Sequence, residues 1–248
     1  MGAADARLLT PSREERRVMD KRSLRDAATV ILVRDPDSAP KVLMGQRGAK
    51  AAFMASKVVF PGGAVDAEDA RVPLSRPMNG LCAGRLEEAS GRLNVGALAA
   101  AAIREVWEET GLILGVPRTW PGTPPPGWQS FAATGHVPSP AGLRFVFRAI
   151  TPQGRPRRFD ARFFTIDAGR VAGDPDDFSR ASDELSHLRW VPVAEARTLD
   201  LPFITQVVLA EVAARLPDLD PPDTVPFFRN EDEDVLVRRL GGASPLDL

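Results

Sequence analysis

The chain has 248 residues, of which 44% are hydrophobic and 26% are charged, and its formal net charge is −1. This size and composition suit one elaborated globular domain and exclude both a fibrous repeat and a chain disordered throughout. Because the charges nearly balance, bulk electrostatics gives no reason to expect non-specific binding to nucleic acid.

The cysteine, the histidines and the length of the apolar runs exclude further classes of protein. Cys82 is the single cysteine, which excludes an intramolecular disulfide and a zinc site of several thiolates, and with no base nearby its thiol is expected to be inert. His136 and His187 have no second His or Cys at metal-ligand spacing, so we expect loop or strand-edge residues. The longest apolar run, 97–103, is too short to cross a bilayer. We therefore expect a cytoplasmic protein without a membrane partner.

The first part of the chain predicts the beginning of a central sheet. Residues 28–33 and 41–45 are apolar runs joined by a proline-containing turn, which indicates a hairpin. A third short run, 58–60, is followed by Pro61-Gly62-Gly63, where glycine permits close approaches that a side chain forbids. We expect a turn here, with another segment or a ligand against it.

A long helix follows an irregular stretch. Residues 69–94 are interrupted by prolines and glycines, which indicates an insertion, with a short helix over 84–93. Residues 97–110 include four consecutive alanines and no internal Gly or Pro, and they predict the best helix in the chain. Asn94 is expected to cap its start and Gly111 to end it.

The second half predicts more of the sheet and a second long helix. After a Pro/Gly-rich loop over 117–127, strands are expected at 143–150, 158–166 and 188–191. An amphipathic helix is expected over 201–216, and edge strands are expected at 225–228 and 235–237.

The strongest chemical signal is at residues 104–112, which read Arg-Glu-Val-Trp-Glu-Glu-Thr-Gly-Leu. At about 100° per residue, Glu105, Glu108 and Glu109 share one face of the helix. Their repulsion weakens the helix unless a cation lies among them, and oxygen ligands suit Mg²⁺. Arg104 lies beside Glu108 on the helical wheel and is placed to hold that carboxylate. The alternative is a solvated acidic face.

The glycine turn and this helix together resemble the signature box of the Nudix hydrolase family, which reads Gly, five residues, Glu, seven residues, Arg-Glu-apolar-x-Glu-Glu-x-Gly-apolar. Residues 104–112 match the second half without exception, and Gly63 matches the first residue. Two departures stand out. Asp69 occupies the place of the first glutamate, and Arg104 lies 41 residues after Gly63 rather than 14. A box with an insertion here, following a Gly-Gly-x-Val-Asp loop, is similar to the subgroup that includes coenzyme A diphosphatases.

The resemblance implies a fold and a division of the chain. It implies the Nudix fold, an α/β (α+β) sandwich with a mixed central sheet between helices. Residues 1–26 are expected to be an N-terminal extension, and 27–216 a Nudix domain with an insertion at about 70–96. Residues 217–248 are expected to form a C-terminal tail packed on the domain.

The resemblance also implies a metal-dependent pyrophosphatase acting on the acid anhydride bond of nucleoside diphosphate-linked compounds, with Mg²⁺ or Mn²⁺ as cofactor. The implied metal ligands are Glu105, Glu108, Glu109 and Gly63, the last through its backbone carbonyl unless it serves only the turn. Arg104 is the implied orienting partner. The base that activates water is expected to be Glu105 or, as second choice, Glu184.

Candidate substrate-binding residues lie outside the box. The arginines expected to bind substrate are Arg47, Arg157, Arg158 and Arg162. The last three, with Arg155, form a local basic cluster suited to phosphates such as the 3′-phosphate of coenzyme A, unless the cluster is a solvated strand edge. Trp107 is expected in the core, and the candidates for stacking on a base are Trp120, Trp128 and Phe131.

Three functions are compatible with these residues. The first is a diphosphatase acting on coenzyme A or its thioesters. The second keeps the chemistry but acts on ADP-ribose, a dinucleotide or an RNA cap. The third is a catalytically inactive nucleotide-binding sensor, which the three mutually repelling glutamates argue against. We expect a small nucleotide-type partner and a homodimer, and we expect neither a membrane nor a nucleic-acid partner.

Overall fold

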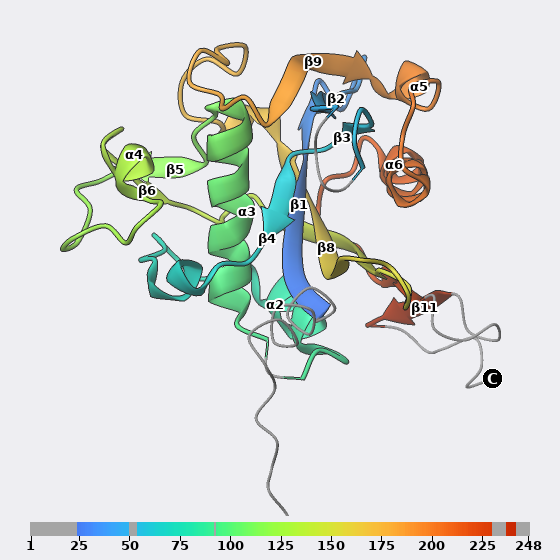
Figure 1. The fold of residues 1–248 in the computed structure, drawn as a ribbon, viewed down its shortest axis with the longest axis horizontal. Helices are drawn as coiled ribbons and strands as arrows, with labels where there is room; N and C mark the ends of the chain where they lie inside the picture. The colour runs from blue at the N-terminus through green and yellow to red at the C-terminus, as the bar shows by residue number, and fades with distance from the viewer. Residues whose placement is uncertain (1–23, 50–53, 92, 230–236, 242–248) are drawn as a thin grey trace, which may run out of the picture.

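The structure of the protein, a computed structural model, describes residues 24–49, 54–91, 93–229 and 237–241. Most of the expected N-terminal extension, 1–23, lies outside the described residues, as do 230–236 and 242–248 of the expected tail. Within the described part, a mixed sheet of nine strands lies between helices (Figure 1), which confirms the expected α/β (α+β) architecture.

The sheet has the order β11-β10-β7-β8-β1-β2-β3, with β4 also paired to β1 and β9 to β2. Its strands are β1 (Leu24–Arg34), β2 (Lys41–Arg47), β3 (Val58–Val59), β4 (Gly62–Ala64), β7 (Arg144–Ile150), β8 (Arg158–Asp167), β9 (Leu185–Pro192), β10 (Val225–Arg229) and β11 (Val237–Leu240). The pairs β1–β8 and β10–β7 are parallel, and the others are antiparallel. A separate two-stranded sheet pairs β5 (Gly115–Pro117) with β6 (His136–Pro138).

Two long helices cover opposite faces of the sheet, α3 (Val95–Thr110) one face and α6 (Phe203–Arg215) the other (Figure 1). The short helical elements are η1 (Ala67–Arg71), α2 (Gly80–Glu87), α4 (Gln129–Ala132), η2 (Ala168–Arg170) and α5 (Val193–Ala196). Among the described residues, we find no helix with the length and apolar character that a membrane span requires.

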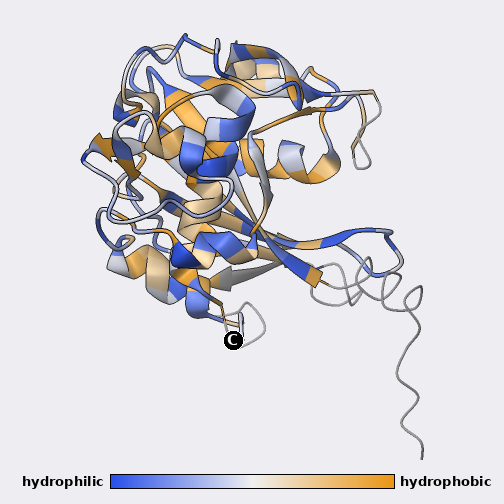
Figure 2. Ribbon diagram, turned by 60° about the vertical axis from the view of Figure 1, so that its left-hand side comes forward, coloured by the Kyte–Doolittle hydropathy of each residue, from blue (hydrophilic) through white to orange (hydrophobic). Residues whose placement is uncertain are grey.

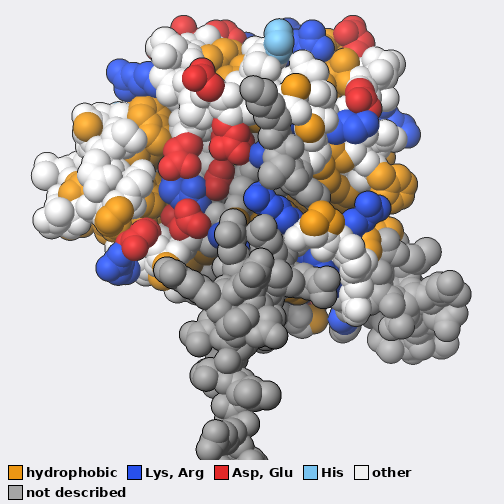
Figure 3. All heavy atoms as spheres, in the orientation of Figure 1, with side chains coloured by type: hydrophobic (Ala, Val, Ile, Leu, Met, Phe, Trp, Pro, Cys, Tyr) orange, Lys and Arg blue, Asp and Glu red, His pale blue; other side chains and the backbone are white. Residues whose placement is uncertain are grey.

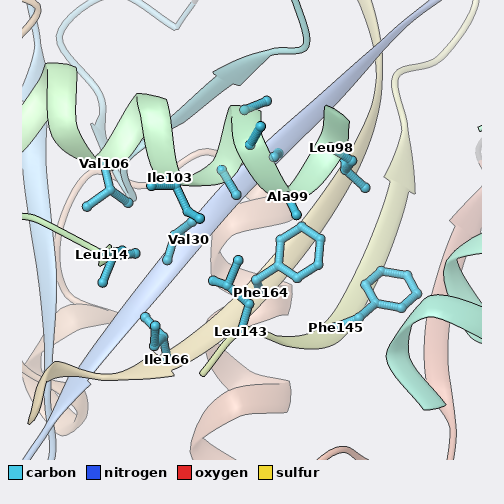
Figure 4. Packing of buried hydrophobic residues seen from close by; sticks show 14 of the residues in the cluster. Val30, Leu98, Ala99, Ile103, Val106, Leu114, Leu143, Phe145, Phe164 and Ile166 are labelled. Carbon is cyan, nitrogen blue, oxygen red and sulfur yellow. The ribbon is translucent and has the colours of Figure 1, made fainter. Parts of the chain in front are cut away.

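Side chains alternate between the two faces of each strand, so the sheet has a hydrophobic core on either face. On β1, Val30 and Leu32 face α3, whereas Ile31 and Val33 belong to the cluster beneath α6, because successive strand residues point to opposite faces. Figure 4 shows the first core, where Ile103 and neighbouring residues of α3 pack over the sheet. The ribbon coloured by hydropathy shows orange, hydrophobic segments running through the interior of the molecule (Figure 2).

Helix α3 confirms its local prediction. The Asn94 side chain accepts a hydrogen bond from the backbone N–H of Ala97 at 3.0 Å, and Gly111 ends the helix with a φ of 74°. The four alanines at 99–102 are fully buried, so the helix axis lies close to the sheet. This packing carries the glutamates of the last two turns to the edge of β4.

Other predictions need adjustment. The expected turn at 61–63 is wrong in part, because Gly62–Ala64 pairs with β1 as β4. In the insertion, the expected helix over 84–93 is wrong in both bounds. Helix α2 begins earlier, where the Asn79 side chain caps it, and it ends at Glu87. The predicted edge strand at 225–228 is confirmed by β10, but residues 235 and 236 of the other lie outside the described part.

Candidate active site

The acidic face of α3 lies beside β4 and η1, and both elements contact the helix. Figure 3 shows Asp and Glu side chains gathered on the face of the molecule that α3 crosses. Backbone groups and two arginines contact these carboxylates.

Arg104 is the centre of the cluster. Its Nη1 donates hydrogen bonds to Glu105 Oε1 at 2.8 Å and Glu108 Oε2 at 3.0 Å, so it holds Glu108 as the helical wheel predicts. Its Nη2 donates to the carbonyl of Ala64 at 2.9 Å. Burial lowers the pKa of Arg104, but the hydrogen bonds to Asp69 and the charge of Glu105 outweigh it and raise the pKa, so the guanidinium stays charged.

Asp69 anchors Arg104 from the insertion. Its Oδ1 and Oδ2 accept from Arg104 Nε at 3.0 Å and Nη2 at 3.1 Å. They also accept from the indole Nε1 of Trp128 at 3.1 Å and the backbone N–H of Asp66 at 2.9 Å. A carboxylate has about four acceptor sites, so these four bonds use its capacity. Asp69 thus serves the arginine, although it stands where the box has glutamate.

Glu109 is the most buried carboxylate of α3, with 1% of its surface exposed. Its Oε2 accepts a hydrogen bond from the backbone N–H of Gly62 at 2.8 Å, whereas its buried Oε1 has no hydrogen-bond partner. Burial, with the charge of Glu105 adding to it, raises the pKa of Glu109 well above its ordinary value. An unpartnered oxygen of this kind is costly to bury unless a cation satisfies it.

Glu105 lies directly against the glycine strand. A Cβ added to Gly63 would stand 2.5 Å from Glu105 Cδ, so the carboxylate occupies space that any other residue at 63 would fill. Burial raises the pKa of Glu105 to about 7, with Arg104 opposing the shift. Burial also raises the pKa of Glu108, the most exposed of the three. Shifted carboxyl pKa values are typical of functional clusters.

Arg47 and Glu184 join the cluster from β2 and the residue before β9. Arg47 Nη2 lies 2.9 Å from Glu184 Oε1, and its Nη1 lies 3.9 Å from Glu109 Oε1. The backbone N–H of Ser182 donates to the carbonyl of Glu108 at 2.8 Å and so ties this loop to α3. The predicted second base and one predicted substrate arginine therefore lie beside the α3 glutamates.

The cluster can be tested against a divalent cation. In the described ranges, no three Asp, Glu, His or Cys side chains already converge as a metal-binding group; two guanidinium groups lie among the carboxylates instead. The donors still fit a hard cation, because all are oxygens, the carboxylates outnumber the arginines, and Glu109 Oε1 accepts no hydrogen bond. The metal roles of Glu105, Glu108, Glu109 and Gly63 stay predictions.

The predicted basic cluster is not brought to this site. Arg162 is fully buried and forms ion pairs with Asp26 and Asp160, so its assignment to substrate is wrong. Arg158 pairs in register with Leu24 on β1, whereas Gly63 pairs with Ala28, which separates the two places by about 13 Å of strand. Arg157 is exposed at the same remote end.

The aromatic residues form a core rather than a stacking surface. Trp128 and Phe131 are fully buried, so the expectation that they stack on a base is wrong. They pack against each other and against Trp120, the third stacking candidate, which is half-buried and belongs to the same core. Phe131 also packs against Trp107, which is buried as expected. Sequence reasoning missed the hydrogen bond from Trp128 to Asp69, since nothing local relates residues 59 positions apart.

The two histidines lie as expected. His136 begins the short edge strand β6, and its Nδ1 contacts Thr134, while His187 is an exposed residue of β9 with a φ of 54°.

A family model and a curated protein are similar to most of this chain. The model of the NUDIX domain matches residues 23–212. A Caenorhabditis elegans protein described as nudix hydrolase 7 is 27% identical over 193 residues, which cover 70% of this chain and 53% of that protein. The chain thus spans about half the length of the curated relative it matches.

One solved structure supports the same fold. A NUDIX hydrolase from Alicyclobacillus acidocaldarius is 29% identical with a TM-score of 0.57, over 77% of this chain and 92% of that chain. The NUDIX domain of Shewanella oneidensis NrtR, solved with ADP ribose, is 13% identical with a TM-score of 0.44, over 78% and 88%. The second similarity is too low to bear on the ligand.

Proposed function

The chain belongs to the NUDIX family of hydrolases, and from this premise we propose that it hydrolyses the diphosphate bond of a nucleoside diphosphate-linked small molecule with a divalent cation. One observation carries the proposal. Glu109 Oε1 is buried without a hydrogen-bond partner inside a cluster where carboxylates outnumber arginines. A divalent cation would satisfy this oxygen, and the proposed reaction would use such a cation.

The three glutamates of α3 would hold Mg²⁺ or Mn²⁺. The bound cation would offset charge on the phosphates and lower the pKa of an attacking water. Glu105 is the proposed base, because its carboxylate lies in the glutamate cluster against Gly63 and Arg104 orients it. Glu184 is the second candidate for that role.

Arg104 and Arg47 have different proposed roles. Arg104 is held by Asp69 and the Ala64 carbonyl, and it orients Glu105 and Glu108. Arg47 lies between Glu109 and Glu184, and its planar fork of donors suits a substrate phosphate. We therefore assign Arg47 to the substrate.

Within this activity we propose coenzyme A or an acyl-coenzyme A as the substrate. The support is the split box, in which the insertion includes α2, together with the Gly-Gly-x-Val-Asp loop. The loss of Arg162 from the substrate cluster removes one reason for this choice. ADP-ribose, a dinucleotide and an RNA cap are the alternatives within the same chemistry.

A substrate panel tests both levels of the proposal. Coenzyme A, acetyl-coenzyme A, ADP-ribose, NADH, a diadenosine polyphosphate and a capped dinucleotide are incubated with the full chain and Mg²⁺ or Mn²⁺, and the products are identified by mass. Release of 3′,5′-ADP from the coenzyme A compounds alone would support the first choice. AMP release from the others alone would reject it, and no cation-dependent turnover of any compound would favour the sensor.

The remaining proposals concern the whole chain. We propose a cytoplasmic homodimer in which 27–216 is the catalytic domain and 217–248 packs on it. The pairing of β10 with β7 supports the packing of the tail. Light scattering on the purified chain tests the dimer, and a monomer mass would reject it.

A further inference from the structure

The hydrogen bond between Trp128 and Asp69 lies entirely inside the protein. Trp128 is 0% exposed and Asp69 is 1% exposed. The indole Nε1–H donates to Asp69 Oδ1 at 3.1 Å, and the same oxygen accepts from Arg104 Nε at 3.0 Å. A group outside the box therefore shares an acceptor with the arginine that holds the glutamates.

Packing determines where this indole points. Trp128 immediately precedes α4, and its ring centroid lies 5.9 Å from that of Trp120 and 5.4 Å from that of Phe131. A ring packed on two sides without solvent contact has little rotational freedom, so its N–H direction is fixed by the core. Asp69 therefore accepts a hydrogen bond from a side chain whose orientation the core fixes.

The contacts continue to the carboxylates of α3. Asp69 binds two nitrogens of Arg104, and Arg104 Nη1 binds Glu105 and Glu108. A shift of the Asp69 carboxylate therefore moves the guanidinium, and with it the two glutamate side chains. A group that hydrogen-bonds a metal ligand commonly influences metal affinity because it orients the ligand, and Arg104 would be that group here, with Asp69 and Trp128 behind it.

We infer that Trp128 is a positioning residue, which sets Arg104 through Asp69 and so holds Glu105 and Glu108 where they take up a divalent cation. The inference deepens the proposed function and rests on it. It assigns a role to the segment around α4, which otherwise serves only as core.

The competing explanation is that Trp128 matters only through packing. Trp128→Phe separates the two, because it keeps an aromatic ring in the core but removes the N–H. Trp120→Phe is the matched control, since Trp120 belongs to the same cluster and its buried Nε1 has no hydrogen-bond partner. Both variants make the same Trp→Phe change, at a fully buried position for Trp128 and a partly buried one for Trp120.

The test uses the full chain and two readouts. Mn²⁺ binding is titrated by electron paramagnetic resonance, and kcat and KM are measured with acetyl-coenzyme A, or with ADP-ribose if only that is hydrolysed. In Trp128→Phe, we expect Mn²⁺ affinity and kcat to fall about 10-fold with KM within about twofold. In Trp120→Phe, we expect all three within about twofold. A Trp128→Phe variant that equals the parent, or the same loss in Trp120→Phe, would overturn the inference.

A second measurement, on the parent, tests the inference if the Trp128→Phe variant does not fold. Indole ¹⁵N–¹H resonances are recorded in the parent, and Trp107, Trp120 and Trp190 are assigned through their own Phe variants, which leaves Trp128. The Trp128 resonance is expected to shift on addition of Mg²⁺ and the Trp120 resonance to stay. An unmoved Trp128 resonance contradicts the inference.

Failure of the inference can be told from failure of the proposed function. If the parent binds Mn²⁺ but hydrolyses nothing in the panel, the proposed function fails, and the Mn²⁺ affinities of the two variants still decide the inference. If the parent binds no Mn²⁺, both fail. If the parent is active and Trp128→Phe equals it, only the inference fails.

Discussion

Two arginine–carboxylate clusters lie in this domain, and their charge balance differs. The acidic site consists of Asp69, Glu105, Glu108, Glu109 and Glu184 with Arg47 and Arg104. The arginine–aspartate network consists of Arg148, Arg162, Asp26 and Asp160. Five carboxylates face two guanidinium groups in the first cluster, whereas the second contains two of each.

This difference in charge balance predicts that mutations in the two clusters affect different properties, activity in one and stability in the other. In the network, Arg148 binds Asp160 at 2.6 Å and also donates to the carbonyls of Glu88 and Ala89, so it joins the end of the insertion to the sheet. Each arginine there has a carboxylate partner, although Arg162 Nε is buried without a hydrogen bond. In the acidic site, Glu109 Oε1 is a buried carboxylate oxygen that accepts no hydrogen bond, and Arg47 Nη1 lies 3.9 Å from it. We therefore expect damage to the network to unfold the protein and damage to the site to stop its chemistry.

The largest effect is expected in the network from Asp160→Asn. This change removes the carboxylate that Arg148 and Arg162 share and leaves two like charges together in the interior. Breaking a buried ion pair costs about 3–5 kcal/mol of unfolding free energy, which urea denaturation measures. The turnover of the folded fraction should stay within about twofold of the parent. A loss of turnover without a loss of stability would reverse the comparison.

The opposite result is expected from Glu109→Gln in the acidic site. Loss of an outer partner of a metal ligand costs about 10–100-fold, so loss of the proposed ligand itself should reduce turnover by more than about 100-fold. Stability should be equal or higher, because the variant no longer buries a charged carboxylate with an unpartnered oxygen. Turnover at the parent rate under saturating Mg²⁺ would show that Glu109 is not a ligand.

The adjacent glycines of β4 sharpen the comparison within one strand. A Cβ at Gly63 meets the end of the Glu105 side chain, which can move, so Gly63→Ala should lower turnover about 10-fold at nearly constant stability. A Cβ at Gly62 would stand 2.5 Å from the Ala28 carbonyl oxygen, so Gly62→Ala should cost about 1–3 kcal/mol of unfolding free energy. Equal stability losses in the two variants would contradict this division.

The smallest effect separates the predicted substrate arginines. Arg47→Met removes a guanidinium 3.9 Å from Glu109 and should raise KM about 10-fold, roughly the value of one lost charge-assisted hydrogen bond. Arg157→Met removes an exposed charge at the remote end of β8 and should change KM by less than about twofold. Steady-state kinetics on the substrate found in the panel measures both. A larger effect at Arg157 would place the substrate phosphates at that end of the sheet.

Local patterns predicted the parts of the structure that local physics determines. Helix α3 follows from alanine content, the Asn94 cap and Gly111, and the contact between Arg104 and Glu108 follows from one turn of helix. The two faces of β1 follow from alternation. The same reasoning located the acidic face before any tertiary contact was known.

Predictions that depended on tertiary contacts were less successful. Alternation in β8 separates Arg162 from Phe163, but it does not say which face is solvated; Ser90, just after α2, lies against the Arg162 face. The sequence places aromatic residues in and after the proline-rich loop, but it does not reveal that Trp128 points inward to Asp69. Both errors arise from elements far apart in sequence that cover a surface expected to be open.

The central claim is that the acidic site, and not the balanced network, binds a divalent cation. Mn²⁺ titration followed by electron paramagnetic resonance, on the parent, Glu109→Gln and Asp160→Asn, tests it most directly. We predict saturable binding in the parent and in folded Asp160→Asn, and at least about 10-fold weaker binding in Glu109→Gln. Equal binding by parent and Glu109→Gln, or none by the parent, would contradict it.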